Sequence, residues 1–354
     1  MIGLISRIIG YNLFKIFGFP KILPVFLTLS VNDWCNSRCK TCNIWKNDPK
    51  EKIKEELTVD EYEKIFENYG KTYWITITGG EPFLRKDLVQ IIKTVYKNTN
   101  PEFLTIATNA TLPKKIVFDV KKILRSCKKL NLIVNISLDG IGSKHDEIRG
   151  LKGNFNKVIK TYNLLKKLKS TRLTVGINTV VSKFNVNDFF KINEYVENIL
   201  KANSFIIEIA ERRDRLSNKD CNITPKYSEY SKILNFLIRK ENRSLGKPKI
   251  LSRLRKEYYR FLLARKNIPV FEGIASAYIM SNGEIWISDS KKIVIGEIRK
   301  ASYNFRNLWF SKSARQFRLK MDKNYRSMLA NSFYVNFVCN PLIVTIIHRC
   351  QKFV

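Results

Sequence analysis

From residue 25 to residue 209 the chain alternates short runs of β-branched and aliphatic residues with amphipathic segments of helical period. The apolar runs predict strands at residues 25–31, 73–78, 103–108, 132–138, 173–181 and 205–209. Helices are predicted between them, the first opening at a capping box of Thr58 and Glu61, and the others at 87–96, 114–127, 156–168 and 186–200. Strands that alternate with helices form parallel βαβ units, so we expect an α/β fold with a partial (β/α)6 barrel of the TIM type. Functional residues of such a barrel gather at the carboxyl ends of its strands.

The pattern changes after residue 209, where a charged stretch is followed by a basic helical region at 226–266. Apolar runs at 277–280 and 284–288, separated by Asn282-Gly283, predict a hairpin with a type I′ turn, and 304–320 is predicted helical. We therefore expect three units: a basic amphipathic segment at 1–24, the barrel core at 25–215, and a smaller α+β domain at 216–354.

The first 24 residues contain Arg7, Lys15 and Lys21 but no acidic residue. Apolar residues recur in them at helical spacing: Ile2, Ile5, Ile9, Leu13 and Ile16. Such a helix suits a membrane surface, and it equally suits packing on the core. The charges interrupt any membrane span, and no signal-peptide cleavage motif precedes the cysteines. We expect a cytoplasmic protein, with a peripheral position at the inner face of the membrane as the open alternative.

The formal net charge is +33, from 64 Lys and Arg against 31 Asp and Glu. Such an excess favours partners rich in phosphate, such as an anionic membrane surface or RNA. Basic residues are spread along the whole chain, so the charge also fits an ordinary solvated surface. Nucleic acid stays a candidate partner, and it is not the favoured one.

Three of the seven cysteines, Cys35, Cys39 and Cys42, fall within eight residues on the loop after the first predicted strand. Their C-x3-C-x2-C spacing lets three thiolates bind one iron-sulfur cluster and leaves one iron without a protein ligand. A zinc site completed by a distant Cys or His, or a purely structural loop, stays open from the spacing alone. A tight cysteine group of this kind is typical of a reducing compartment.

Further motifs follow the later strands at the expected intervals. They are Gly79-Gly80-Glu81-Pro82, Thr108-Asn109-Ala110, Ser137-Leu138-Asp139-Gly140, the run from His145 to Gly150 with Gly153 and Phe155, and the run from Gly176 to Val180. Together with the cysteines they resemble the radical S-adenosylmethionine (SAM) superfamily. The resemblance implies that Cys35, Cys39 and Cys42 hold a [4Fe-4S] cluster. It also implies a set of SAM-binding residues: Gly79, Gly80, Glu81, Pro82, Asn109, Ser137, Asp139, Arg149 and Asn178.

The implied reaction begins when an external one-electron donor of the flavodoxin or ferredoxin type reduces the cluster. SAM is then cleaved to a 5′-deoxyadenosyl radical, which abstracts hydrogen from the substrate; the protein orients and shields this chemistry. Thr41 stands where many members of the superfamily have an aromatic residue, and this difference does not affect the resemblance to the superfamily. His145 is expected to hydrogen-bond within its loop rather than to contact SAM.

The region after residue 270 resembles the SPASM/twitch extension of radical SAM maturases. Phe271, Ser288 and Asp289 stand where the resemblance implies auxiliary-cluster cysteines, so an intact auxiliary cluster is expected to be lost. A partial cluster using Cys221, Cys339 or Cys350 stays open.

The substrate is expected to meet Glu208, Glu211 and Arg212, at or just after the last barrel strand, although these residues also suit a solvated charge run between domains. Three functions compete. The first is a radical SAM enzyme acting on a peptide, a lipid or a sugar-type metabolite. The second is an RNA-modifying radical SAM enzyme, and the third is a non-catalytic protein with a structural metal site.

Overall fold

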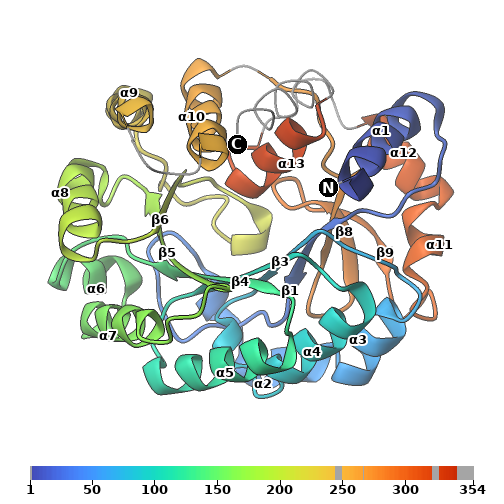
Figure 1. Cartoon of the computed structure of the whole chain (residues 1–354), viewed down its shortest axis with the longest axis horizontal. Coiled ribbons are helices and arrows are strands. Elements are labelled where there is room, and N and C mark those ends of the chain that lie inside the picture. Colours follow the sequence, from blue (N-terminus) through green and yellow to red (C-terminus); the bar gives the residue numbers. More distant parts are fainter. Residues whose placement is uncertain (1, 244–248, 266, 321–326, 341–354) are drawn as a thin grey trace.

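The computed structural model describes residues 2–243, 249–265, 267–320 and 327–340, and its strands form one mixed sheet (Figure 1). The strand order is β6-β5-β4-β3-β2-β1-β7-β8-β9. The first six strands are β1 (Phe26–Ser30), β2 (Trp74–Thr78), β3 (Phe103–Thr108), β4 (Asn131–Ser137), β5 (Leu173–Val181) and β6 (Ser204–Ile209). All neighbours among these six pair in parallel, and β6 and β9 remain as edges. The predicted partial barrel is therefore confirmed, and it is open.

Helices that connect the parallel strands lie along the outer side of the sheet (Figure 1). They are α2 (Pro49–Glu55), α3 (Val59–Phe66), α4 (Leu88–Thr99), α5 (Pro113–Ser126), α6 (Ser143–Arg149), α7 (Asn154–Lys166) and α8 (Phe189–Glu194). The predicted capping box is present, since the Glu61 amide donates to Thr58 Oγ1 and the Thr58 amide donates to Glu61 Oε2. Apolar side chains of α3, α4, α5 and α7 share one core with the strands.

The C-terminal strands extend the same sheet past β1. They are β7 (Ser276–Ile279), β8 (Glu284–Ser288) and β9 (Ile293–Glu297). β7 pairs with β1 in parallel, and β8 and β9 follow antiparallel. The predicted hairpin is confirmed, but its type I′ turn is wrong. Met280 pairs with Glu284 and only Gly283 has a positive φ, because the loop has three residues and needs one left-handed position.

The remaining helices are α1 (Ile2–Phe17), α9 (Tyr227–Arg243), α10 (Lys249–Ala264), α11 (Phe305–Trp309), α12 (Lys312–Lys320) and α13 (Ala330–Val338). The region predicted helical at 226–266 is thus two helices, and 304–320 is broken between α11 and α12. Residues from β5, β6, α9, α10 and α13 form a second core. The division at residue 215 stays a prediction, since both parts share the sheet.

Helix α1 packs on the protein through Ile8 and Tyr11, which lie in a small core with Val25 and Phe271. The Tyr11 hydroxyl donates to Leu23 O at 2.8 Å. The predicted apolar stripe lies elsewhere on the helix, and its members Ile9, Leu13 and Ile16 are exposed. In the described residues, no helix is both long and apolar enough to span a membrane.

Candidate active site at the carboxyl ends of the strands

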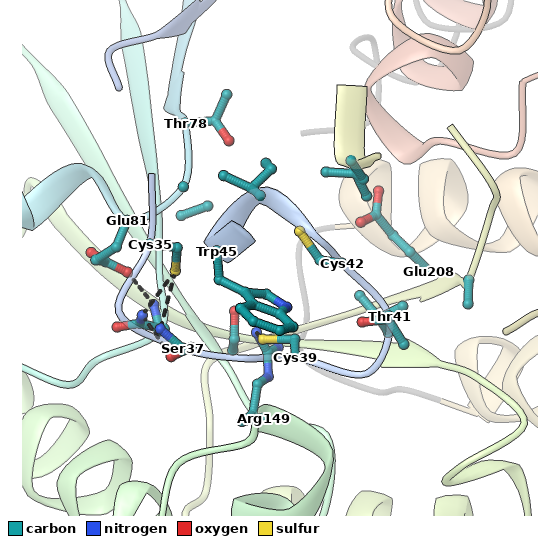
Figure 2. Close-up of a pocket in the computed structure, with 18 of the residues that line it drawn as sticks. Cys35, Ser37, Cys39, Thr41, Cys42, Trp45, Thr78, Glu81, Arg149 and Glu208 are labelled. Carbon is teal, nitrogen blue, oxygen red and sulfur yellow. Dashed lines mark hydrogen bonds between the residues drawn. The ribbon is translucent and has the colours of Figure 1, made fainter. Parts of the chain in front are cut away.

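One pocket of about 170 Å³ lies at the carboxyl ends of the parallel strands (Figure 2). Its lining comes from the cysteine loop and from the ends of β2, β3, β4, β5 and β6. Of the residues predicted from sequence, it brings together Cys35, Cys39, Cys42, Gly79, Gly80, Glu81, Asn109, Ser137, Arg149, Glu208 and Glu211. Pro82, Asp139, Asn178 and Arg212 do not line it.

The three cysteines of the loop are free thiols that line this pocket. Burial raises the pKa of Cys35 to about 12 and also raises the pKa values of Cys39 and Cys42. Figure 2 shows the Trp45 indole among the three sulfur-bearing side chains, and Trp45 also lines the pocket. No group of three His, Cys, Asp or Glu side chains within the described ranges is already arranged to hold a metal ion. The ligand role of the thiols therefore stays a prediction.

Polar groups from the cysteine loop, the end of β3 and the end of α6 approach two of the sulfur atoms. The Ser37 amide lies 3.4 Å and Asn109 Nδ2 lies 3.6 Å from Cys35 Sγ, and Arg149 Nη1 lies 3.8 Å from Cys39 Sγ. Donors and a cation near a sulfur favour its thiolate form, which is the form that binds iron. Three unpaired thiols with such neighbours are a donor set that fits an iron-sulfur cluster.

The glycines after β2 allow the cysteine loop to lie directly on the strand end. A Cβ on Gly80 would stand 1.9 Å from Trp34 O, and one on Gly79 would stand 2.2 Å from Asn32 Oδ1. Gly79 also has a φ of 153°, which disfavours other residues. Asn32 Nδ2 donates to Glu81 O at 2.8 Å, so the loop and the Gly79–Pro82 motif form one unit.

Glu81 is almost completely buried, with 1% of its surface exposed. Its carboxylate accepts hydrogen bonds from Thr108 Oγ1 at 2.8 Å, the Asn109 amide at 2.6 Å and the Phe83 amide at 3.1 Å. Burial raises its pKa to about 7, although these donors and Arg149 favour the ionised form. The carboxylate is therefore fixed in position and poised between two protonation states near neutral pH.

Asn109 holds the cysteine loop from the end of β3. Its Nδ2 donates to Asn36 Oδ1 at 2.8 Å and to Ser37 Oγ at 2.9 Å. Its side chain thus has a structural task besides any contact with a cofactor.

Asp139 and Arg149 form a buried ion pair behind the pocket, with 2.7 Å between Oδ2 and Nη2. Asp139 Oδ1 also accepts from the Val180 amide at 2.9 Å. His145 accepts from the Asp139 amide through Nδ1 at 3.1 Å and contacts Asn154 through Nε2, so the predicted loop role of His145 is confirmed. The buried Asn178 Oδ1 has no hydrogen-bond partner among the residues that the structure describes.

Two carboxylates face the pocket where β6 ends. Glu208 Oε1 accepts from the Ala330 amide at 3.1 Å, and Glu211 Oε1 accepts from the Met328 amide at 3.4 Å. Within the part of the chain that the structure describes, Glu211 Oε2 is buried without a hydrogen-bond partner, and burial raises the pKa of this carboxyl. Arg212 is exposed, and its neighbour Arg213 lines the pocket in its place.

The sequence did not reveal that residues 213–221, called the clasp below, hold the cysteine loop. The Asn43 amide donates to Leu216 O, and Asn218 Nδ2 donates to Thr41 O, both at 2.8 Å. Arg213 and Arg215 of the clasp contact Asp289, which follows β8, at 2.8 and 3.1 Å. The charged run at 211–220 was visible in the sequence, but its partner Asp289 is about 75 residues away and carries no local signal.

Of the cysteines considered for a second cluster, Cys221 and Cys339 lie in different parts of the fold. Cys339 is buried with α1 in the small core, and Cys221 Sγ lies 3.4 Å from Asn43 Nδ2 in the clasp. Cys350 lies outside the described residues.

The fold and the pocket are typical of a class of enzymes that have an open (β/α) barrel and a cysteine loop at the carboxyl ends of its strands. The family model of the Radical SAM superfamily matches residues 29–196. The probable GTP 3′,8-cyclase of Methanococcus vannielii is 30% identical over 236 residues, which are 66% of this chain and 74% of that protein. The chain belongs to the radical SAM superfamily, and it is an enzyme of that superfamily.

A second relative is similar over a shorter span, and two solved structures share the fold. The GTP 3′,8-cyclase of Clostridium botulinum (strain Hall) is 33% identical over 172 residues, covering 46% of this chain and 49% of that one. The chain thus spans about half the length of that relative. Streptococcus suis SuiB bound to S-adenosylmethionine has a TM-score of 0.59 at 15% identity, covering 87% and 70% of the two chains. AnSMEcpe with bound AdoMet has a TM-score of 0.55 at 21% identity, covering 83% and 82%. The family cofactors are a [4Fe-4S] cluster and SAM. The SPASM-like character of the C-terminal region stays a prediction.

Proposed function

We propose that Cys35, Cys39 and Cys42 hold the [4Fe-4S] cluster and that the strand-end motifs around them bind SAM. The single observation that supports this most is the pocket itself, because it collects the cysteine loop and the ends of five parallel strands. When bound, the two cofactors supply reductive cleavage of SAM and hydrogen abstraction from the substrate. An external donor of the flavodoxin or ferredoxin type is proposed to deliver the electron.

The residues of the chain position these cofactors. Glu81 and the Gly79-Gly80 backbone are proposed to receive the ammonium group of SAM, since a buried carboxylate suits a cation. Arg149 is the proposed partner of the SAM carboxylate, and Asp139 fixes its guanidinium through the 2.7 Å ion pair. Asn109, Ser137, Pro82 and Asn178 complete the proposed SAM site.

Glu208 and Glu211 are proposed to receive a cationic group of the substrate. Both carboxylates line the pocket, and Glu211 Oε2 is buried with no hydrogen-bond partner among the described residues, which is costly unless a cation or donor compensates it. Two such carboxylates would repel the triphosphate of a nucleotide such as GTP at this end of the pocket. A peptide with a lysine or amino group suits the site better. The solved structures of SuiB with the precursor peptide SuiA and of anSMEcpe with a Cp18Cys peptide support this class.

The test of the main proposal is anaerobic purification with iron and sulfide analysis, followed by reduction with SAM and assay of 5′-deoxyadenosine. We expect about four irons per chain, and we expect Cys39→Ala to lose both cluster and product. Cys127→Ala is the matched control, because Cys127 is equally buried but lies at the end of α5, outside the pocket. Zinc in place of iron, or equal cluster loss in both variants, would overturn the assignment.

An RNA substrate is the second candidate, supported by the net charge of +33. It predicts binding that weakens steeply with salt, so salt-insensitive or negligible RNA binding would exclude it. We also propose that the enzyme works at the inner face of a membrane, for the reasons given next.

A further inference from the structure

Helix α1 exposes large apolar side chains on the side that faces away from the protein. This apolar ridge consists of Ile9, Leu13, Ile16 and Phe17 of the helix, with Phe19 just after its end. Their side chains are between 41% and 72% exposed, whereas Ile8 and Tyr11 on the packed side are at most 5% exposed. Burial of the packed side is thus complete without the ridge. An exposed apolar patch on a surface helix marks an interaction site.

A basic pocket lies beside α1, which contributes Ser6 and Arg7 to it. It has a volume of about 460 Å³ and is lined by Ser6, Arg7, Lys21, Ile22, Leu23, Tyr69 and Arg306. Three of its residues are cations and none is an acid. In the described part of the chain, no carboxylate forms an ion pair with Arg7, Lys21 or Arg306. Three gathered cations without a counter-charge favour a bound anion.

The neighbouring helix α12 adds to the positive charge. Its sequence KSARQFRLK contains four basic residues and no acid, and the exposed ones include Lys312 and Arg315. Arg318 of α12 lies 5.7 Å from the Phe14 ring of α1, and Figure 1 shows the two helices at the same end of the molecule. Charge and exposed apolar surface therefore coincide at this end.

We propose that this end of the molecule docks on an anionic phospholipid membrane, with the apolar ridge in the lipid interface and a phosphate headgroup in the basic pocket. A free phosphate would use the pocket but not the ridge, and an RNA would use the charges but not an aliphatic ridge. A lipid surface uses both, because such helices bind through apolar area and attraction to anionic headgroups together. This deepens the proposed location and does not depend on the proposed chemistry, since docking requires neither cluster nor SAM.

The test is co-sedimentation of the full chain with vesicles of equal parts phosphatidylcholine and phosphatidylglycerol, compared with phosphatidylcholine alone. We expect roughly tenfold or stronger binding to the anionic vesicles, from the summed attraction of several basic residues. Ile16→Ser with Phe17→Ser should weaken binding to the anionic vesicles by roughly tenfold or more, from lost apolar burial. Lys21→Gln with Arg306→Gln should reduce the preference for phosphatidylglycerol.

The matched control is Phe118→Ser with Lys122→Gln on α5. Phe118 is 56% exposed, and Lys122 Nζ lies 4.2 Å from its ring centroid, so this pair also removes an exposed aromatic and a cation. The control should leave vesicle binding unchanged, and all variants should keep the urea midpoint of the parent protein.

Several outcomes would overturn the proposal. They are absent binding to anionic vesicles, equal weakening by the control, and full vesicle binding by the variant Ile16→Ser with Phe17→Ser. If the parent protein is a dimer and the variant Ile16→Ser with Phe17→Ser is a monomer, the ridge would instead bind a second copy of the chain. Cluster content and 5′-deoxyadenosine formation in detergent-free buffer are measured on the same preparations. They separate a failure of docking from a failure of the enzymatic assignment.

Discussion

Replacing Asp289 by Asn should destabilise the protein, because the Asp289 carboxylate balances the charges of Arg213 and Arg215. Asp289 is 3% exposed, and the side chains of Arg213 and Arg215 are 15% and 11% exposed. Asn keeps the volume of the side chain but removes its charge, so two nearly buried guanidinium groups lose their counter-ion. Breaking a buried ion pair on one side costs about 3–5 kcal/mol. Since both arginines retain some exposure, we expect a loss of about 3 kcal/mol in the free energy of unfolding.

Urea unfolding of the full chain measures this loss. Glu147→Gln is the control, because the exposed pair of Glu147 with Lys40 should contribute almost nothing. A second measurement is the rate at which thiols of the cluster-free protein react with an alkylating reagent. Asp289 anchors the clasp and the clasp holds the cysteine loop, so this rate should rise in Asp289→Asn. The reasoning fails if the urea midpoint of Asp289→Asn equals that of Glu147→Gln.

Three further changes test the strand-end site and its supports. Gly80→Ala should cost about 1–3 kcal/mol in urea unfolding, since the new Cβ would stand 1.9 Å from Trp34 O; a midpoint within error of the parent would contradict the close approach. SAM should bind roughly fourfold tighter at about pH 8 than at about pH 6, because Glu81 has a pKa of about 7 and only its ionised form attracts the ammonium group, part of which loses its own proton by about pH 8. Calorimetric titration measures this, and Glu81→Gln should remove the increase in affinity with pH. Thr58→Ala should cost about 1 kcal/mol in urea unfolding by removing the capping box shared with Glu61, and an unchanged midpoint would show that the cap contributes nothing.

The parallel half of the fold could be predicted because its signals are local. Each strand from β1 to β6 is a short run of β-branched residues, and the Thr58 capping box marks the start of α3. The strand-end motifs directly follow these runs in the sequence. Their residues could therefore be predicted to lie at the carboxyl ends of the strands. The pocket residues Cys35, Glu81 and Arg149 could therefore be proposed together before any coordinates existed.

The remaining features depend on pairings between distant residues. The parallel pairing of β7 with β1 joins Ser276 to Phe26, and no local pattern encodes which edge a later strand selects. Whether Arg212 or Arg213 lines the pocket depends on the direction in which each side chain points after β6. Sequence periodicity does not predict this direction in a loop. For α1, the sequence left two interpretations of the apolar stripe, contact with a membrane surface and packing on the core. The structure shows that Ile8 and Tyr11, rather than the stripe residues Ile9 and Leu13, contact the core.

The pairing of β7 with β1 makes the C-terminal region difficult to exchange as a module. With β7 and β2 on its two sides, β1 is an interior strand, and the cysteine loop begins at its end. A chain that ended after β6 would leave one side of β1 with unpaired backbone groups, which invite association with other chains. Grafting of a C-terminal region from a relative must therefore recreate the register of Phe26 with Ser276. Otherwise the graft would change the strand that carries the cofactor loop.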